Sequence, residues 1–128
     1  MTAARKVKLT HEALRALQEI QRRSIAEWGA RTAKRYMADL QAALDRIAMN
    51  PGLPVVYRDL HDELTFYRVN RHPFVCDIAD DSIVIVAVLH SSMDLAARLT
   101  ELLPSLSAEI HILHNQFRGT GQARKRRN

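Results

Sequence analysis

The chain has 128 residues, of which 47% are hydrophobic, so it is long enough for one domain with a sizeable core. Its one cysteine, Cys76, excludes a disulfide framework, and its longest apolar run, Ile83 to Leu89, is too short to cross a membrane. Met1 to Leu14 has charged residues at its start but no apolar core, unlike a signal peptide. We therefore expect a soluble, cytoplasmic protein without membrane contact.

The net charge of +5 comes from one end of the chain. Residues 1–117 hold 14 Lys and Arg and 14 Asp and Glu, so the excess lies in a tail over residues 118–127 that contains Arg118, Arg124, Lys125, Arg126 and Arg127. Basic tails of this kind are usually disordered, and they can hold nucleic acid or an acidic partner through screened attraction. A solvated tail without a specific role is the alternative. The body is expected to have no overall positive field.

The first predicted elements are a short strand and an amphipathic helix. Polar and apolar residues alternate over Lys6 to Leu9, as in a strand with one buried face. Thr10 supplies an N-cap hydroxyl, and Glu12 suits the positive end of a helix. The apolar stripe then continues at steps of three and four, which predicts a helix of about 18 residues that ends at Gly29.

A second amphipathic helix follows almost at once. One face of it carries Ala33, Tyr36, Met37, Leu40, Ala43, Leu44 and Ile47. Asn50-Pro51-Gly52 ends this helix. The short link around Gly29 requires the two helices to form an antiparallel hairpin, whose apolar face must pack on the downstream strands.

Three strands are predicted over residues 64–69, 74–79 and 83–89, joined by short polar turns that make neighbouring strands antiparallel. Residues 53–62 are interpreted as a loop or a short edge strand broken by Pro54. The run from Ile83 to Leu89 is almost purely apolar, which is typical of a central strand covered on both faces.

After the last strand, leucines predict a brief helix that ends before Pro104, and residues 105–117 have the spacing of a last, loosely attached helix. We therefore expect a domain over residues 1–103 and an extension over residues 104–128 with a helix and a flexible basic tail. The order β-α-α-β-β-β-α predicts an α+β fold, in which an antiparallel two-helix hairpin packs on a small antiparallel sheet.

Four local patterns recur together in a known group of proteins. They are Ile25-Ala26-Glu27-Trp28-Gly29, the second helix with its Asn50-Pro51 stop, the strand Phe66-Tyr67-Arg68-Val69-Asn70-Arg71, and the apolar strand that leads to His90 and Asp94-Leu95. In this order, over about residues 5–103, the chain resembles the ParE branch of the RelE/ParE superfamily of bacterial toxins. It departs from the family at residues 58–63, which are more acidic than the family's Arg-rich loop.

The resemblance implies that the chain has a RelE/ParE-like fold. It also implies that the chain is the toxin component of a type II toxin–antitoxin system, with roles in growth inhibition and plasmid stabilisation. A cognate antitoxin would neutralise it along the helical hairpin and the open sheet surface, with one extended or helical segment filling an apolar groove. ParE-like toxins are associated with poisoning DNA gyrase, whereas RelE-like toxins cut messenger RNA on the ribosome. We expect a gyrase inhibitor that acts by binding, without a catalytic residue, cofactor or metal. The alternatives are a RelE-like ribosome-dependent endoribonuclease and a weakened toxin that acts mainly as an antitoxin-binding co-repressor partner.

Cleavage of RNA needs proton donors and acceptors, and cations beside the phosphate. RelE-like members supply several Lys and Arg from the sheet and a tyrosine near the C-terminus. Here the sheet region offers Arg58, Arg68 and Arg71, and the segment from Ser91 to Leu103 has no tyrosine. These differences favour binding over cleavage.

Three groups of titratable residues are candidates for a functional site, and each also has a simpler structural interpretation. His90 and Asp94 could form an acid–base pair, but we favour Asp94 as a helix cap and His90 as a hydrogen-bond partner in the turn. His72 precedes Pro73 in a turn and is expected to be exposed. His111 and His114 share a helix face without enough neighbouring ligands for a metal site.

The end of the helical hairpin is the expected contact region. Trp28 there can anchor an interface, although burial between the two helices is the favoured interpretation. Four arginines surround it, and a solvated face is the alternative for them. The candidate residues for contact with target or antitoxin are Trp28, Arg22, Arg23, Arg31, Arg35, Arg68, Arg71, His90 and Asp94.

Overall fold

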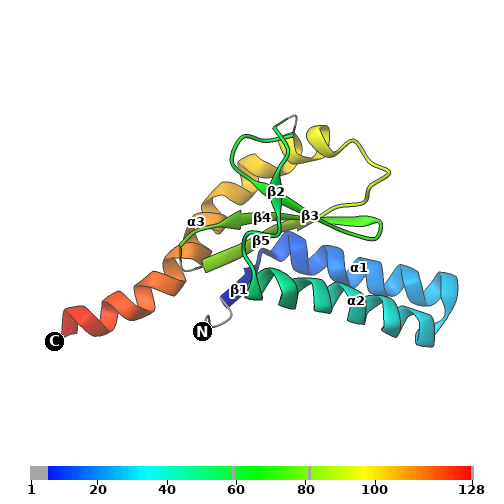
Figure 1. Ribbon diagram of the computed structural model, residues 1–128, viewed down its shortest axis with the longest axis horizontal. Helices are drawn as coiled ribbons and strands as arrows, with labels where there is room; N and C mark the ends of the chain where they lie inside the picture. The colour runs from blue at the N-terminus through cyan, green and yellow to red at the C-terminus, as the bar shows by residue number, and fades with distance from the viewer. Residues whose placement is uncertain (1–5, 59, 81, 128) are drawn as a thin grey trace.

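The computed structural model describes residues 6–58, 60–80 and 82–127, with side chains through residue 116. The elements in chain order are β1 (Lys6–Leu9), α1 (His11–Trp28), α2 (Ala30–Met49), β2 (Val55–Val56), β3 (Thr65–Val69), β4 (His72–Ile78), β5 (Ser82–Val88) and α3 (Leu95–Arg127) (Figure 1). The α+β class and the two-helix hairpin predicted from the sequence are confirmed. No helix in the described part of the chain is long and apolar enough to span a membrane.

The five strands form one sheet in the order β1-β5-β4-β3-β2. The pairs from β2 to β5 are antiparallel, as the short turns predicted, whereas β1 lies parallel to β5. The sheet is therefore mixed, which corrects the expectation of a purely antiparallel one. Only β1 departs from that expectation, because it precedes the whole helical hairpin and reaches β5 through a long connection.

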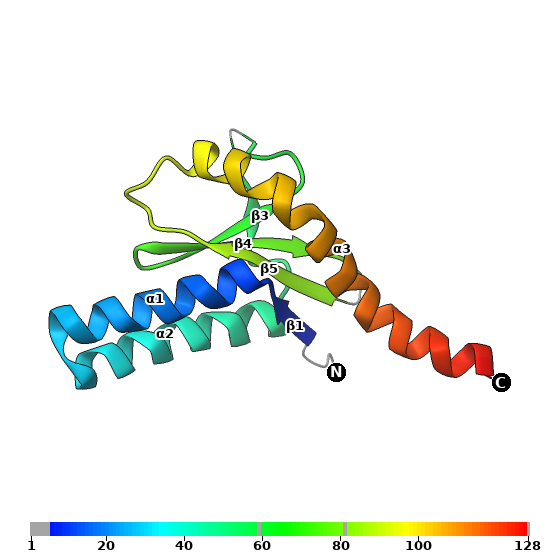
Figure 2. The ribbon, with the colours of Figure 1, turned by 180° about the vertical axis from the view of Figure 1, so that it is seen from behind.

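Both faces of the sheet are covered by helices (Figure 2). On one face, the hairpin packs Leu40 and Ile47 against a core that includes Phe74, Ile83 and Ile85. On the other face, α3 packs on side chains that include Val75, Val84 and Val86. All seven residues of β5 are buried, so the apolar run marks a central strand with two covered faces, as its composition predicted.

The C-terminal helix differs from the prediction. Leu95–Arg127 is one helix that contains Pro104, and it replaces the brief helix before Pro104 and the loosely attached helix over 105–117. A proline inside a helix costs about 3 kcal/mol. Burial of Leu99, Leu106 and Ile110 on the sheet contributes about 1.5–3 kcal/mol each, so packing on both sides of Pro104 outweighs its cost.

Polar contacts add to the attachment of α3. His114 is buried and its two ring nitrogens contact Ser82 Oγ at the start of β5 and Asp77 Oδ1 on β4, at 2.5 and 3.1 Å. Glu109 accepts hydrogen bonds from the backbone N–H and the ring of His11, the first residue of α1. Both ring nitrogens of His114 are thus occupied by protein groups, which supports a structural role rather than metal ligation.

Thr10 joins the hairpin to the central strand. Its hydroxyl oxygen accepts a hydrogen bond from Ala13 N–H at 3.0 Å, which confirms the predicted N-cap of α1. The same hydroxyl donates to the carbonyl of Val86 at 2.7 Å, and the Thr10 backbone N–H donates to Ile85. The register of β4 and β5 shifts between Val75 and Cys76, next to this contact. One buried side chain therefore fixes where α1 begins relative to β5.

We predict that Thr10→Val lowers the free energy of unfolding by about 2 kcal/mol, because it removes the helix cap and leaves the Val86 carbonyl without its donor. Urea unfolding followed by circular dichroism measures the change. Thr32→Val, on the exposed face of α2, is the matched control and is expected to cost only a few tenths of a kcal/mol. Equal losses in the two variants would contradict the anchoring role of Thr10.

Candidate binding groove

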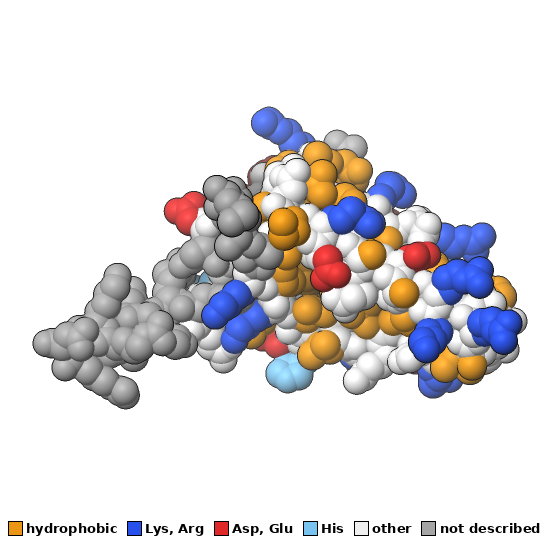
Figure 3. All heavy atoms as spheres, turned by 60° about the horizontal axis from the view of Figure 1, so that its bottom comes forward, with side chains coloured by type: hydrophobic (Ala, Val, Ile, Leu, Met, Phe, Trp, Pro, Cys, Tyr) orange, Lys and Arg blue, Asp and Glu red, His pale blue; other side chains and the backbone are white. Residues whose placement is uncertain are grey.

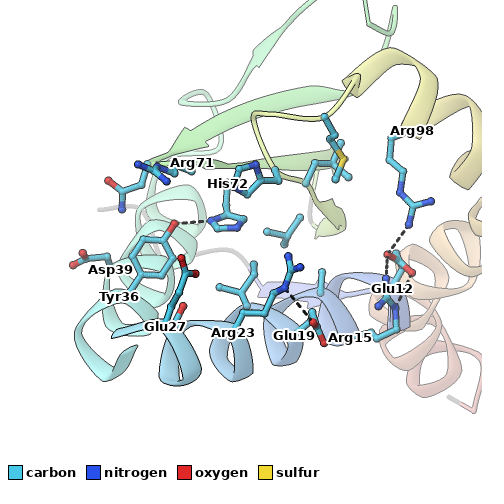
Figure 4. Close-up of a pocket in the computed structure, with 18 of the residues that line it drawn as sticks. Glu12, Arg15, Glu19, Arg23, Glu27, Tyr36, Asp39, Arg71, His72 and Arg98 are labelled. Atoms are coloured by element: carbon cyan, nitrogen blue, oxygen red, sulfur yellow. Dashed lines mark hydrogen bonds and ion pairs between the residues drawn. The ribbon is translucent and has the colours of Figure 1, made fainter. Parts of the chain in front are cut away.

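A groove of about 670 Å³ lies between the hairpin and one end of the sheet (Figure 4). Helix α1 forms one wall, and Tyr36 and Asp39 of α2 extend this wall. The turn between β3 and β4 and the loop after β5 form the opposite side, which includes Arg71, His72 and His90. The volume is within the range of about 300–1,000 Å³ that is typical of ligand pockets. We call this cavity the groove.

Four rings form a continuous chain along the groove. Trp28 contacts Tyr36 edge to face with centroids 6.1 Å apart, and Tyr36 contacts His72 at 5.7 Å. His72 in turn lies edge to face with His90 at 5.1 Å. The chain joins the end of α1, the second turn of α2, the start of β4 and the loop after β5. It therefore holds the two sides of the groove at a set distance.

A hydrogen bond across the groove connects α2 with the sheet. The Tyr36 hydroxyl and His72 Nδ1 are 2.5 Å apart. Burial raises the pKa of Tyr36, while a backbone hydrogen bond from Arg71 and its charge partly offset this rise. Burial lowers the pKa of His72 to about 4, and the neighbouring His90 and Arg71 charges add to the effect. At neutral pH the phenol is thus protonated and donates to the neutral imidazole.

Most charges on the α1 wall are paired with one another. Glu12 accepts a two-pronged contact from Arg15 and lies 3.7 Å from Arg98 of α3. Arg23 lies 3.5 Å from Glu19. Arg71, across from this wall, forms no ion pair with the described residues and is exposed. The groove therefore offers one free guanidinium beside the chain of rings.

The structure divides the contact residues predicted from the sequence into two sets. Those that line the groove are Trp28, Arg23, Arg71 and His90. Those outside it are Arg22, Arg31, Arg35, Arg68 and Asp94. Trp28 is 48% exposed, so the favoured interpretation of burial between the helices is wrong. Its edge contact with Tyr36 leaves much of the indole open to the groove.

His90 and Asp94 have the plainer roles that the sequence favoured. Asp94 Oδ1 accepts from Ala97 N–H and caps α3. His90 Nδ1 accepts from Ser92 N–H within the turn and contacts the Ser92 hydroxyl. Each group is engaged in its own local motif, and the described hydrogen bonds include none between them. This arrangement does not form an acid–base pair.

Tyr36 and His72 belong to the site although the sequence did not predict it. His72 was expected to be exposed in a turn, but it begins β4 and is half-buried. Tyr36 was assigned only to the apolar face of its helix. A polar aromatic on an apolar stripe was the available signal, because a buried tyrosine hydroxyl usually needs a hydrogen-bond partner. Which partner it has depends on how the hairpin lies on the sheet.

The basic side chains of residues 118–127 lie outside the described side chains.

The fold and the groove define a small α+β protein whose open cleft is suited to binding. Residues 7–95 match the family described as ParE toxin of type II toxin-antitoxin system, parDE. The chain is also 35% identical over 96 residues to Toxin ParE of Escherichia coli, a match that covers 74% of this chain and 93% of that protein. The chain therefore belongs to the ParE toxin family of type II toxin–antitoxin systems. Its α3 begins where the family match ends.

Two solved structures share the fold. One is described as the chromosomal ParDE TA system from P. aeruginosa, with a TM-score of 0.60 and 11% identity, covering 68% of this chain and 96% of that chain. The other is described as the toxin-antitoxin complex RelBE2 from Mycobacterium tuberculosis, with a TM-score of 0.52 and 19% identity, covering 70% and 94%. The RelE/ParE-like architecture predicted from the sequence is confirmed.

We predict that His72 makes the protein less stable as the pH falls from 6.5 towards 4. Its pKa in the folded state, about 4, is below the ordinary value of 6.5, so the unfolded chain binds the proton first in this interval. The stability that comes from neutral His72 is complete above pH 6.5 and is lost as the pH falls through the interval. Urea unfolding across this range should give a smaller pH slope for His72→Gln than for the unmodified protein.

The matched control is His111→Gln, because His111 is exposed on α3. It should keep the slope of the unmodified protein. If His72→Gln also keeps that slope, the lowered pKa of His72 is not a property of the folded protein.

Proposed function

We propose that this ParE-family toxin inhibits DNA gyrase by binding, and that a cognate antitoxin neutralises it by occupying the groove. Family membership supports the class of toxin, and the resemblance to ParE supports gyrase as the target. The single observation that carries the binding mechanism is the groove, with its chain of four rings and the free guanidinium of Arg71.

The groove has the features of a protein interface. Trp28, Tyr36 and arginine are residue types that dominate binding energy when a partner covers them. The rings are already held by one another and by the bond between Tyr36 and His72, so little side-chain freedom is lost when a partner binds. Gyrase and antitoxin would compete for this surface, which explains how one partner can block the other.

We propose that the antitoxin binds beside the hairpin rather than on the open sheet surface expected from the sequence. The hairpin covers one face of the sheet and α3 covers the other, so neither face is open along β5. The groove remains as the large concave surface beside the hairpin. We therefore place a segment of the antitoxin in it, with an apolar side chain against Trp28 and a carboxylate near Arg71.

RNA cleavage is the competing function, and the site supports it less well. A general base must reach the proton that it removes, and a general acid must be protonated at the working pH. His72, with its pKa at about 4, is neutral and already accepts from Tyr36. His90 accepts from Ser92, and Asp94 caps α3. The groups suited to proton transfer are thus already engaged in structural hydrogen bonds.

We predict that Trp28→Ala raises the concentration of toxin needed for half-maximal gyrase-mediated DNA cleavage by about thirtyfold. This corresponds to the loss of an anchor worth about 2 kcal/mol. The control is Met49→Ala, because Met49 is at least as exposed as Trp28 but lies at the C-terminal end of α2, outside the groove. Purified gyrase and supercoiled plasmid, with linear DNA as the readout, provide the assay.

Expression of the toxin should stop growth with an SOS response and filamentation. Halted translation with cleaved messages would instead support the endoribonuclease, and growth without any defect would support a weakened toxin that mainly binds its antitoxin. Equal potency of Trp28→Ala and Met49→Ala in the cleavage assay would remove the groove from the gyrase contact.

A further inference from the structure

The end of the hairpin carries a dense group of cations, of which only Arg23 also lines the groove. We define the hairpin tip as residues 21–38, the last turns of α1 and the first turns of α2. Its cationic side chains are all exposed, and they are Arg22, Arg23, Arg31, Lys34 and Arg35. Figure 3 shows Lys and Arg side chains gathered over the end of the molecule where the two helices meet.

The neutral body predicted from the sequence is strongly uneven in charge. Of the 14 Lys and Arg in residues 1–117, five lie in the hairpin tip, together with only Glu27 of the 14 Asp and Glu. The rest of residues 1–117 then holds nine cations and 13 anions, so the tip carries a formal +4 and the remainder −4. This separation gives the tip a positive field that the net charge conceals.

Most of this charge is not neutralised within the molecule. Arg31, Lys34 and Arg35 form no ion pair with any residue that the structure describes. Arg22 and Arg23 share the carboxylate of Glu19, and their side chains remain 71% and 74% exposed. These arginines can therefore reach an external anion without first breaking a buried pair.

The backbone adds to the same field. Helix α2 begins at the tip after Gly29, which has a φ of +90° and no side-chain hydrogen bond to the helix end. The first turn of α2 contains no acidic residue. The positive end of its dipole therefore faces the same solvent as Arg31.

We propose that the hairpin tip binds the sugar-phosphate backbone of DNA. The inference rests on the proposed function and deepens it, because it assigns the DNA in the gyrase complex to the tip and leaves gyrase itself to the groove. Trp28 lies within the tip and also lines the groove, so the two surfaces meet at this residue. One toxin molecule would then contact both components of the cleavage complex.

The density of cations favours DNA over an acidic protein surface. Arg31, Lys34 and Arg35 are three and four residues apart on one helix face, so they lie within about 6 Å along its axis. Duplex DNA presents one negative charge for about every 1.7 Å of its axis, a continuous match for such a stripe. A protein surface would need several unpaired carboxylates equally close together, at the cost of their mutual repulsion.

The test measures DNA binding without gyrase. Anisotropy of a short fluorescein-labelled duplex of mixed sequence gives the affinity between about 50 and 200 mM salt. The double variant Arg31→Gln/Arg35→Gln should bind about tenfold more weakly, with a slope of log affinity against log salt that is smaller by about two. Lys6→Gln/Arg58→Gln removes the same charge from exposed positions outside the tip and should keep the slope. The basic tail is present in every variant and cancels in the comparison.

The gyrase cleavage assay on the same variants separates this inference from the proposed function. If the tip variant loses gyrase-dependent cleavage but binds duplex with the slope of the control variant, the tip contacts gyrase protein and the inference is wrong, while the proposed function stands. If the tip variant loses duplex binding as predicted but the unmodified toxin never promotes cleavage, the inference stands and gyrase is not the target. Absence of duplex binding by the unmodified protein would also overturn it.

Discussion

Burial of β5 on both faces is the constraint on which the rest of the structure depends. Ile83 and Ile85 face the helical hairpin, whereas Val84 and Val86 face α3, so neither layer can be removed without exposing a row of apolar side chains. Thr10 ties the start of α1 to the same strand through the carbonyls of Ile85 and Val86. His114 ties α3 to the other end of it through Ser82. The two helical layers are thus placed independently against one rigid element.

The groove follows from this placement. Since the base of α1 is fixed at β5 and the hairpin is long, its outer end extends past the sheet, as Figures 1 and 2 show. Two sets of contacts then hold the hairpin against this end of the sheet. They are the chain of rings from Trp28 to His90 and the hydrogen bond between Tyr36 and His72. The α1 wall presents ion pairs to the groove, whereas the outer end also presents Arg31, Lys34 and Arg35, which form no ion pair with the described residues. Rigid placement of two chemically different surfaces on one hairpin would let a small protein contact the two partners that we propose, gyrase and DNA.

Local sequence rules predicted the features that depend on neighbours in the chain. The Thr10 cap, the stop at Gly29 and the covered strand from Ile83 to Leu89 all appear where they were expected. The predictions that were wrong concern features that depend on contacts between segments far apart in the chain. Pro104 predicts a helix end, but packing of α3 on the sheet outweighs the cost of the proline. His72 was assigned to an exposed turn, because its burial depends on Tyr36, which lies 36 residues earlier in the chain and on another layer.

Hydrogen–deuterium exchange of the toxin bound to gyrase and DNA would test most directly the claim that the groove and hairpin tip form the contact surface. Backbone amides of residues 21–38 and of the turn at residues 70–72 should exchange more slowly in the complex than in the free protein. Amides of β2, at the far edge of the sheet, should exchange at an unchanged rate. Slower exchange confined to β2 or α3, with the hairpin tip unaffected, would contradict the account.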